Sequence, residues 1–310
     1  MTNESLGSRS RLIIGALLLL AACSIATAGV LVRAAYERGS EPMSVLALRV
    51  AVGAAVAWGY VLLTVRPERP RLRVTPAAAA ALGLFGLLEL GAQFGEIQAL
   101  QTLPAALVVL MFALAPVWIA VTGWALWREA VGPRGVAAVT AALVGTIIVV
   151  GPPGGNIDLG GVGFAVGGGL AGATALLLYE RRLTEWRPQV ALAVAMTVCA
   201  AVVAVADPSL FADELTGGSA RAALVIGSAL GFVFSLLLVL YCIQRASAFI
   251  ASMAATSEPV FASVIAWLAL GEVVALHQFA GGALAVTGLW LAVGAALPSA
   301  RRRPAHDRLT

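Results

Sequence analysis

Ten long apolar runs, separated by short polar connections, constrain this chain more than any other feature of its sequence. A helix needs about 20 apolar residues to cross the hydrocarbon core of a bilayer. The runs cover residues 12–33, 43–65, 76–98, 104–127, 133–151, 160–179, 188–206, 221–243, 248–270 and 275–297. The connections between them carry turn-forming Pro and Gly and are too short for a separate soluble domain. The sequence therefore predicts an all-α integral membrane protein with ten transmembrane helices.

The composition agrees with a membrane protein and argues against several other classes. About 60% of the residues are hydrophobic and 12% are charged, whereas soluble domains carry roughly 25% charged residues. The basic side chains are arginines in short loops and tails, with no lysine, which favours membrane topology over nucleic-acid binding. The three cysteines lie in apolar runs without CxxC spacing, so we expect no metal site, no disulfide framework and no cofactor.

The arginines also predict the orientation of the chain. If the N-terminus is cytoplasmic and ten helices cross the membrane, 16 arginines fall in inside segments and three, Arg33, Arg38 and Arg221, fall outside. Short cytoplasmic loops carry an excess of Arg and Lys. We therefore expect a multi-pass protein of the cell (plasma or inner) membrane with both termini in the cytoplasm, including a basic tail over residues 298–310.

The N-terminal segment has two interpretations. The stretch SRSRLIIGALLLLAAC, which ends at Cys23, resembles a lipoprotein signal with a basic start, an apolar core and a cysteine after small residues. The alternative is an ordinary first transmembrane helix. We favour the helix, because the apolar run continues past Cys23 to Val32 and because cleavage would remove most of one helix from the repeat described next.

The chain contains an internal repeat. The stretch LAPVWIAVTGWALWRE, residues 114–129, aligns without a gap with SEPVFASVIAWLALGE, residues 257–272. In apolar helices matches of Val, Ala and Gly are common by chance, but matches of Pro, Trp and Glu are not. These rarer matches are Pro116 with Pro259, Trp124 with Trp267 and Glu129 with Glu272.

The repeat predicts two related halves, residues 11–151 and 159–297, each with five helices. Because five is odd, the second half is inverted relative to the first, which places Glu129 at the inner face and Glu272 at the outer face. Inverted repeats are typical of transporters that work by alternating access, with a site near the midplane. We therefore expect two inverted five-helix repeats around a central cavity.

Polar side chains inside the third run indicate part of a site. Glu89, Gln93 and Glu96 share one helix face over about 10 Å. An ionisable group at mid-membrane costs about 2.5–3.5 kcal/mol on insertion scales, so each one needs a partner, a cavity or a function. The equivalent positions of the second half are all apolar: Phe232, Leu236 and Val239. We expect a cavity wall that binds an amine or exchanges a proton; the alternative is carboxylates satisfied by neighbouring helices, with Glu96 solvated near the surface.

A carboxylate beside a proline marks the ninth run. Pro259 removes a backbone donor and frees a carbonyl near Ala255, and Glu258 precedes it. Irregular backbone is tolerated at membrane depth where protein or a water-filled cavity satisfies it. We expect a gating helix beside the transport pathway, with Pro116 forming the equivalent kink in the first half. The alternative is a structural role for Glu258, paired with Arg49.

Three further polar residues lie in or near the runs. Arg49, in the second run, cannot lose its charge, so it must snorkel or pair with an acid or with carbonyls; binding a substrate carboxylate is the other interpretation. Tyr241 and Gln244 are candidate hydrogen-bond donors near the end of the eighth run.

The segments PMSVLALRVAVGAAVAW (42–58), ALQTLPAALVV onward (99–151) and ASMAATSEPVF onward (251–294) resemble the EamA family of the drug/metabolite transporter superfamily. The resemblance covers nearly the whole chain. It implies a ten-helix fold with a central cavity and export of metabolites or drugs, often amino acids. Arg49, Glu258–Pro259, Glu129 and Glu272 match the family pattern, which favours a structural ion pair for Arg49.

The sequence thus favours a secondary transporter, not an enzyme, that exports small polar or cationic metabolites, with proton antiport as an option. A passive facilitator of the same fold is the first alternative, and a membrane enzyme or lipid-handling protein is a weaker one, because closely spaced His and Asp residues are absent. The expected partners are a small-molecule substrate, the lipid bilayer and protons, but not nucleic acid. The two-half design can work as a monomer, or as a weak homodimer.

Overall fold

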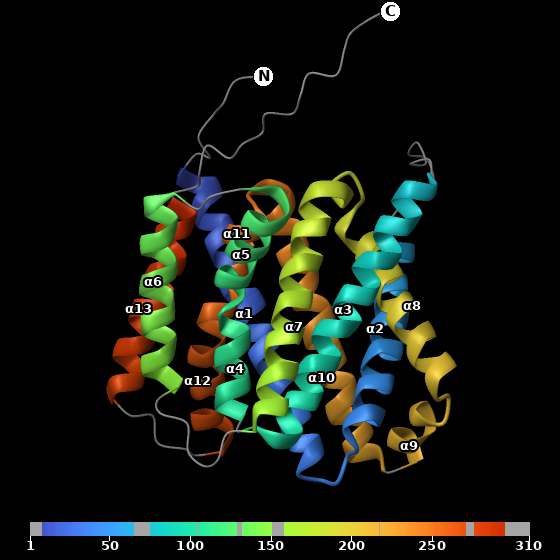
Figure 1. The fold of residues 1–310 in the computed structure, drawn as a ribbon. Helices are drawn as coiled ribbons and strands as arrows, with labels where there is room; N and C mark the ends of the chain where they lie inside the picture. The colour runs from blue at the N-terminus through green and yellow to red at the C-terminus, as the bar shows by residue number, and fades with distance from the viewer. Residues whose placement is uncertain are drawn as a thin grey trace, which may run out of the picture.

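The structure, a computed structural model, describes residues 8–64, 75–103, 105–128, 132–150, 158–216, 218–270 and 276–294. Within these ranges the chain forms helices and no strand, and the helices stand side by side as a bundle (Figure 1). The elements are α1 (Ser8–Tyr36), α2 (Pro42–Thr64), α3 (Pro76–Thr102), α4 (Ala105–Ala113), α5 (Ala115–Trp127), α6 (Pro133–Val150), α7 (Leu159–Leu178), the π-helical turn η1 (Tyr179–Leu183), α8 (Pro188–Ala206), α9 (Leu210–Thr216), α10 (Ser219–Arg245), α11 (Ala248–Ser252), the 3₁₀ turn η2 (Ala255–Ser257), α12 (Glu258–Leu270) and α13 (Leu276–Gly294).

The bundle is that of a multi-pass membrane protein. Over the described ranges, seven helices are long and apolar enough to cross a bilayer, and α4 with α5, which meet at a bend of 44°, make an eighth candidate. Two shorter apolar helical stretches, Pro133–Ile148 and Phe279–Ala292, belong to α6 and α13. Helix α1 runs without a break through Cys23.

Proline and capping side chains determine where several helices begin. Helices α2, α3, α6 and α8 each begin at a proline, which has no N–H to leave unpaired and a φ angle suited to the first turn. Asp158 precedes α7 and accepts a hydrogen bond from the Gly161 N–H at 2.8 Å. This bond lowers the pKa of the Asp158 carboxyl below its ordinary value.

We call the end of the bundle where α1 begins the upper end, and the opposite end, where α9 lies, the lower end (Figure 1).

The predicted runs that contain Pro116 and Pro259 are each interrupted before the proline. The first is bent by 44° at its interruption, whereas the second remains one candidate span over Ala248–Ile265. The run 104–127 divides at Leu114 into α4 and α5, and the run 248–270 divides into α11, η2 and α12. Pro116 and Pro259 each lie at the second residue of the helix that follows the interruption, where a proline has no N–H of its own to leave unpaired. At the first break the Trp118 indole N–H donates to the Met111 carbonyl at 3.1 Å, which satisfies one freed acceptor.

The second half reproduces the element bounds of the first. The matched prolines Pro116 and Pro259 are 143 residues apart (259 minus 116). Adding 143 to the bounds of α3 and α5 gives the bounds of α10 and α12, and the same shift of α6 ends one residue short of α13. The bounds of α2 and α8 agree to within a few residues. Helix α9 falls in the connection 206–219, where the sequence predicted no helix.

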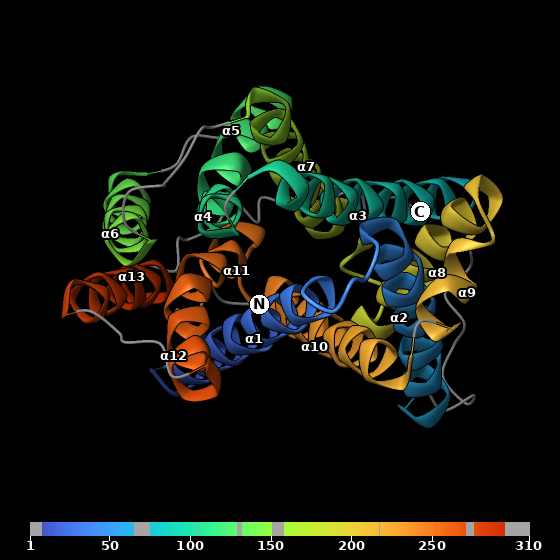
Figure 2. The ribbon, with the colours of Figure 1, turned by 90° about the horizontal axis from the view of Figure 1, so that it is seen from below.

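Helix neighbours also come in corresponding pairs. Helix α3 packs on α7 and α8, and α10, its counterpart, packs on α1 and α2, the counterparts of α7 and α8. Helix α5 packs on α7 as α12 packs on α1. Two pairs of counterparts, α2 with α8 and α6 with α13, pack against each other at opposite sides of the bundle (Figure 2).

Small residues bring α6 and α13 into close contact. A methyl group at Gly145 would lie 2.5 Å from the carbonyl oxygen of Gly281, and one at Gly288 would lie 2.6 Å from the backbone nitrogen of Ala142. Gly145 comes after Ala142 in α6, whereas its contact Gly281 comes before Gly288 in α13. The two helices are therefore antiparallel. Gly145 and Gly288 are counterparts in the repeat, so one packing contact occurs twice. Small residues permit such approach where helices associate within lipid.

Some predicted features lie outside the described residues. These are Glu129, Glu272, most of the connections 66–76 and 151–158, and the tail 298–310.

Gly145→Ala is expected to lower the melting temperature of the purified protein, because the new methyl group would overlap backbone atoms of α13. Overpacking of this kind costs about 1–3 kcal/mol. Gly163→Ala in α7 is the matched control, since a methyl group there meets nothing within 4 Å and alanine favours the helix. Thermal unfolding in detergent compares the two variants, and equal melting temperatures would contradict the close packing.

Candidate functional site

A cavity of about 820 Å³ lies in the centre of the bundle. Its walls come from α1, α3, α4, α7, α10 and α12, with one residue of α5 and four of the α11–η2 region. The flanking helices α2, α6, α8 and α13 contribute none of the described lining residues. On α1 and α3 the lining begins at Ala22 and Glu89 and continues toward the helix C-termini, so the cavity extends from mid-bundle to the lower end. Arg33, with a side chain 63% exposed, lines its lower part, so the cavity reaches the surface there.

The polar stripe predicted on the third run lines this cavity. Glu89, Gln93 and Glu96 all face it from α3. Glu89 is 5% exposed and Gln93 is 2% exposed, so both lie deep in the bundle. The opposite wall includes Phe232, Leu236 and Val239 of α10, which are the repeat counterparts of the stripe. One cavity thus has a polar wall from the first half and an apolar wall from the second.

Gln93 stands out among the polar lining residues. Both atoms of its amide, Oε1 and Nε2, are buried, and neither has a hydrogen-bond partner among the described residues. The serine hydroxyls of the cavity, by contrast, donate to backbone carbonyls, for example Ser235 to Ala21 at 2.9 Å and Ser252 to Phe249 at 2.7 Å. A buried amide without a partner loses hydrogen-bond free energy. Gln93 therefore lies in the cavity wall with a donor and an acceptor that no described residue uses.

Arg49 of α2 forms an ion pair with Glu96, one acid of the polar stripe on α3. Its Nη1 lies 3.7 Å from Glu96 Oε2, and its guanidinium carbon lies 4.4 Å from the centroid of the Phe232 ring. The ion pair therefore joins Arg49 to Glu96, and not to Glu258 as the structural alternative predicted. Arg49 is 3% exposed and does not line the cavity. It neutralises one acid of the stripe and holds an aromatic ring of the opposite wall, which fits a positioning role.

Glu258 joins the acids of α3 at the same cavity. It is the first residue of α12, and Pro259 beside it also lines the wall. Both Glu96 and Arg49 act electrostatically on Glu258, so the three charges share one neighbourhood. Pro116 is buried one residue beyond the lining residue Ala115. The structure thus brings four predicted residues, Glu89, Gln93, Glu96 and Glu258, to one cavity.

Tyr241 and Gln244 lie away from the cavity, toward the upper end of α10. Gln244 Nε2 lies within hydrogen-bond distance of the Tyr179 hydroxyl at 3.0 Å and of the Trp186 carbonyl at 2.8 Å. Tyr241 lies beneath the guanidinium of Arg245, 3.4 Å from the ring centroid. Gln244 therefore links α10 to η1 and does not contact the central cavity.

The sequence analysis did not assign two cavity residues to the site. Tyr36 lines the lower part of the cavity, and its buried hydroxyl has no partner among the described residues. Arg33 lies one turn earlier on α1 and pairs with Glu37 at 3.3 Å. Both residues sit at the end of an apolar run, where aromatic and basic residues usually mark the membrane interface. Only the packing of α1 against the other helices of the cavity wall shows that these two side chains face the cavity.

These features define a class: a helical membrane protein whose halves enclose a polar cavity open to one end. The sequence profile of the EamA-like transporter family matches residues 12–151 and again residues 159–294. The chain therefore belongs to the EamA-like transporter family, within the drug/metabolite transporter superfamily.

Solved structures agree with this fold. Among 29 matching chains, one titled "Crystal structure of protein" superposes with a TM-score of 0.67 at 20% sequence identity, over 93% of this chain and 98% of its own. A search of curated proteins found no match. The likeness at this identity concerns the fold alone.

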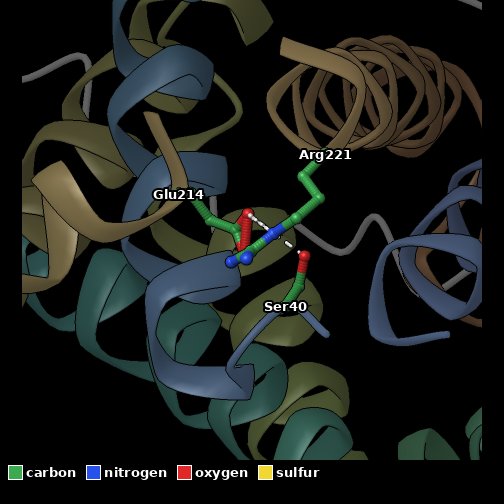
Figure 3. Close-up of polar contacts among 3 residues, drawn as sticks. All are labelled: Ser40, Glu214 and Arg221. Atoms are coloured by element: carbon green, nitrogen blue, oxygen red, sulfur yellow. Dashed lines mark hydrogen bonds and ion pairs between the residues drawn. The ribbon is translucent and has the colours of Figure 1, made fainter. Parts of the chain in front are cut away.

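A second group of buried charges lies outside the cavity, at the lower end. The Glu214 side chain is fully buried in α9 and accepts hydrogen bonds from Arg221 of α10, with Nη2–Oε1 at 3.1 Å and Nε–Oε2 at 3.3 Å (Figure 3). The Ser40 hydroxyl, from the turn between α1 and α2, donates to Oε2 at 3.1 Å. These three side chains tie the first half to the second at this end.

Arg221→Gln is expected to destabilise the protein by about 3 kcal/mol, because it leaves the Glu214 carboxylate buried without its counter-charge. The double variant Glu214→Gln/Arg221→Gln removes both charges and should recover much of the loss. Thermal or denaturant unfolding in detergent measures the three proteins. Equal stability of the single variant and the unmodified protein would show that this ion pair does not hold the lower end together.

Proposed function

We propose that the protein is a secondary transporter of the cell membrane that exports small polar or cationic metabolites by alternating access. The observation that carries the proposal is the central cavity, where Glu89, Gln93 and Glu258 converge in a member of a transporter family. A cavity of about 820 Å³ is in the range of small-molecule sites. Such a site with a few convergent polar groups is the expected form of a metabolite pathway.

The charge pattern favours a cationic or amine-bearing substrate. Three carboxylates face the cavity, from Glu89, Glu96 and Glu258, and Arg49 offsets one of them. The remaining negative charge can bind an ammonium group, and the unpartnered amide of Gln93 can donate to and accept from a polar substituent. The apolar wall around Phe232 then contacts the hydrocarbon part of the substrate. The same carboxylates could exchange a proton for the cation, which gives proton antiport a physical route.

Ten spans arranged as two inverted repeats account for alternating access. The shared element bounds at an offset of 143 residues, the paired helix neighbours and the antiparallel contact of α6 with α13 support this arrangement. In transporters of this type one half rocks against the other around a fixed site. The breaks before Pro116 and Pro259 border the cavity in both halves and supply the hinges.

The arginine distribution supports an assignment of which side of the membrane the cavity faces. With both termini in the cytoplasm, the lower end faces outward, and the cavity that reaches it corresponds to an outward-facing state. The upper end is then the inner gate, where Gln244 binds the η1 segment. A single chain encloses the whole cavity, so a monomer is sufficient for transport.

Glu89→Gln is expected to reduce uptake of an amine substrate into proteoliposomes by about tenfold or more, because a charge-assisted hydrogen bond contributes about 1.5–3 kcal/mol. Substrates come from a panel of amines, amino acids and cationic drugs, each measured with and without an imposed pH gradient. Glu37→Gln is the matched control, because Glu37 is 63% exposed and does not line the cavity.

The outcomes separate the candidate functions. Loss of uptake in Glu89→Gln with normal folded yield supports the proposed site, and flux driven by the pH gradient supports proton coupling. Flux that ignores the gradient assigns the protein to passive facilitators. Unchanged uptake of every transported substrate in Glu89→Gln would contradict the role of the polar stripe.

A further inference from the structure

A second hollow, of about 840 Å³, lies near the upper end of the bundle. It is bounded by α1 and α10 on one side and by α2 and α8 on the other. Its lining shares no residue with that of the central cavity. We call it the upper groove.

The inner part of the upper groove is apolar. Ile13 and Leu17 of α1 and Phe234 and Leu237 of α10 line it. Ile13 is 51% exposed and Phe234 is 44% exposed, although both are large apolar residues of membrane-spanning helices. A large exposed apolar side chain on such a helix faces lipid. The upper groove therefore opens to the bilayer, and an acyl chain is the natural contact of its floor.

The mouth of the upper groove is polar and lies at helix ends. Thr64 is the last residue of α2, Pro188 is the first of α8 and Arg245 is the last of α10. Tyr60 and Tyr241 flank the mouth, exposed by 44% and 37%. Helix ends with exposed tyrosines mark the depth of lipid headgroups. A lipid whose chain lay on the apolar floor would place its headgroup at this mouth.

The charge at the mouth is positive. Arg187 and Arg245 both line it, and the described lining residues include no carboxylate. Arg245 stacks on the Tyr241 ring and donates one N–H to the Tyr241 carbonyl at 3.3 Å, which uses one of its five donors. The nearby Glu180 carboxylate accepts from the Ala248 N–H at 3.1 Å and does not line the groove. Two guanidinium groups at the edge of an apolar groove match a phosphodiester above an acyl chain.

We propose that the upper groove is a binding site for an acidic phospholipid of the leaflet at the upper end. Arg187 and Arg245 bind the phosphate, and one acyl chain lies along α1 and α10. Basic pockets between transmembrane helices bind the headgroups of anionic lipids for this reason. A zwitterionic lipid binds more weakly, because its cationic group finds no carboxylate among the described lining residues of the mouth.

The position of the site gives it a consequence for the fold. Helices α1 and α2 belong to the first half of the chain and α8 and α10 to the second, so a lipid in the upper groove contacts both halves. Because the groove borders all four helices, bound lipid favours the arrangement that keeps it open.

Lipid titration of the purified protein tests the site. The melting temperature is measured in a mild detergent with added phosphatidylglycerol, with phosphatidylcholine, and with inorganic phosphate alone. Phosphatidylglycerol is expected to raise the melting temperature more than phosphatidylcholine does, and inorganic phosphate is expected to leave it unchanged. Loss of each arginine–phosphate contact is expected to weaken phosphatidylglycerol binding about tenfold.

The variants assign any effect to the groove. Arg187→Gln/Arg245→Gln should lose the response to phosphatidylglycerol, whereas Arg187→Lys/Arg245→Lys, which keeps the charge, should retain most of it. Arg182→Gln, an exposed arginine at the same end outside the groove, is the matched control and should respond like the unmodified protein. An undiminished response in the Gln double variant, an equal response to phosphatidylcholine, or a response to phosphate alone would overturn the proposal. If the Gln double variant does not fold, the test uses the other two variants. The proposal is then overturned if Arg182→Gln loses the response to phosphatidylglycerol while Arg187→Lys/Arg245→Lys keeps it.

Discussion

Polar side chains inside an apolar bundle are the constraint on which the rest of this structure depends. A charged or hydrogen-bonding group in the hydrocarbon region costs free energy unless a partner or water satisfies it. The bundle pairs Arg49 with Glu96 and places it over the ring of Phe232, and Glu89 and Gln93 line a cavity. The acids and the amide that line the cavity are therefore the groups on which both the stability of the bundle and its function depend.

The framework around this cavity is symmetric, but the wall chemistry is not. Element bounds, broken helices and the glycine contact of α6 with α13 recur at one offset along the chain. The stripe on α3 is polar, whereas its counterpart on α10 is apolar. Duplication supplies two halves that pack in the same way, and divergence of one face supplies a cavity with a charged side and an apolar side.

The all-helical membrane fold could be predicted from sequence, because long apolar runs indicate membrane-spanning helices. The repeat could be predicted because it preserves Pro, Trp and Glu. Spacing alone placed Glu89, Gln93 and Glu96 on one face. Other features depend on tertiary packing. Pro116 and Pro259 marked both interruptions, but apolar composition could not predict a 44° bend at the first and a 3₁₀ turn at the second. The partner of Arg49 was chosen by how α2 packs near α3 and α10, and the fully buried Glu214 lies in a segment that reads as a polar loop.

The most direct test of the account is the sidedness of two counterpart positions, Arg38 in the turn after α1 and Arg181 in η1, which are both exposed and also lie 143 residues apart (181 minus 38). Single cysteines at these positions, in a background without the three native cysteines, are labelled with a membrane-impermeant thiol reagent in right-side-out and inside-out vesicles. Inverted halves predict that Arg38→Cys reacts only from the outside and Arg181→Cys only from the inside. Labelling of both positions from the same side of the membrane would contradict the inverted arrangement.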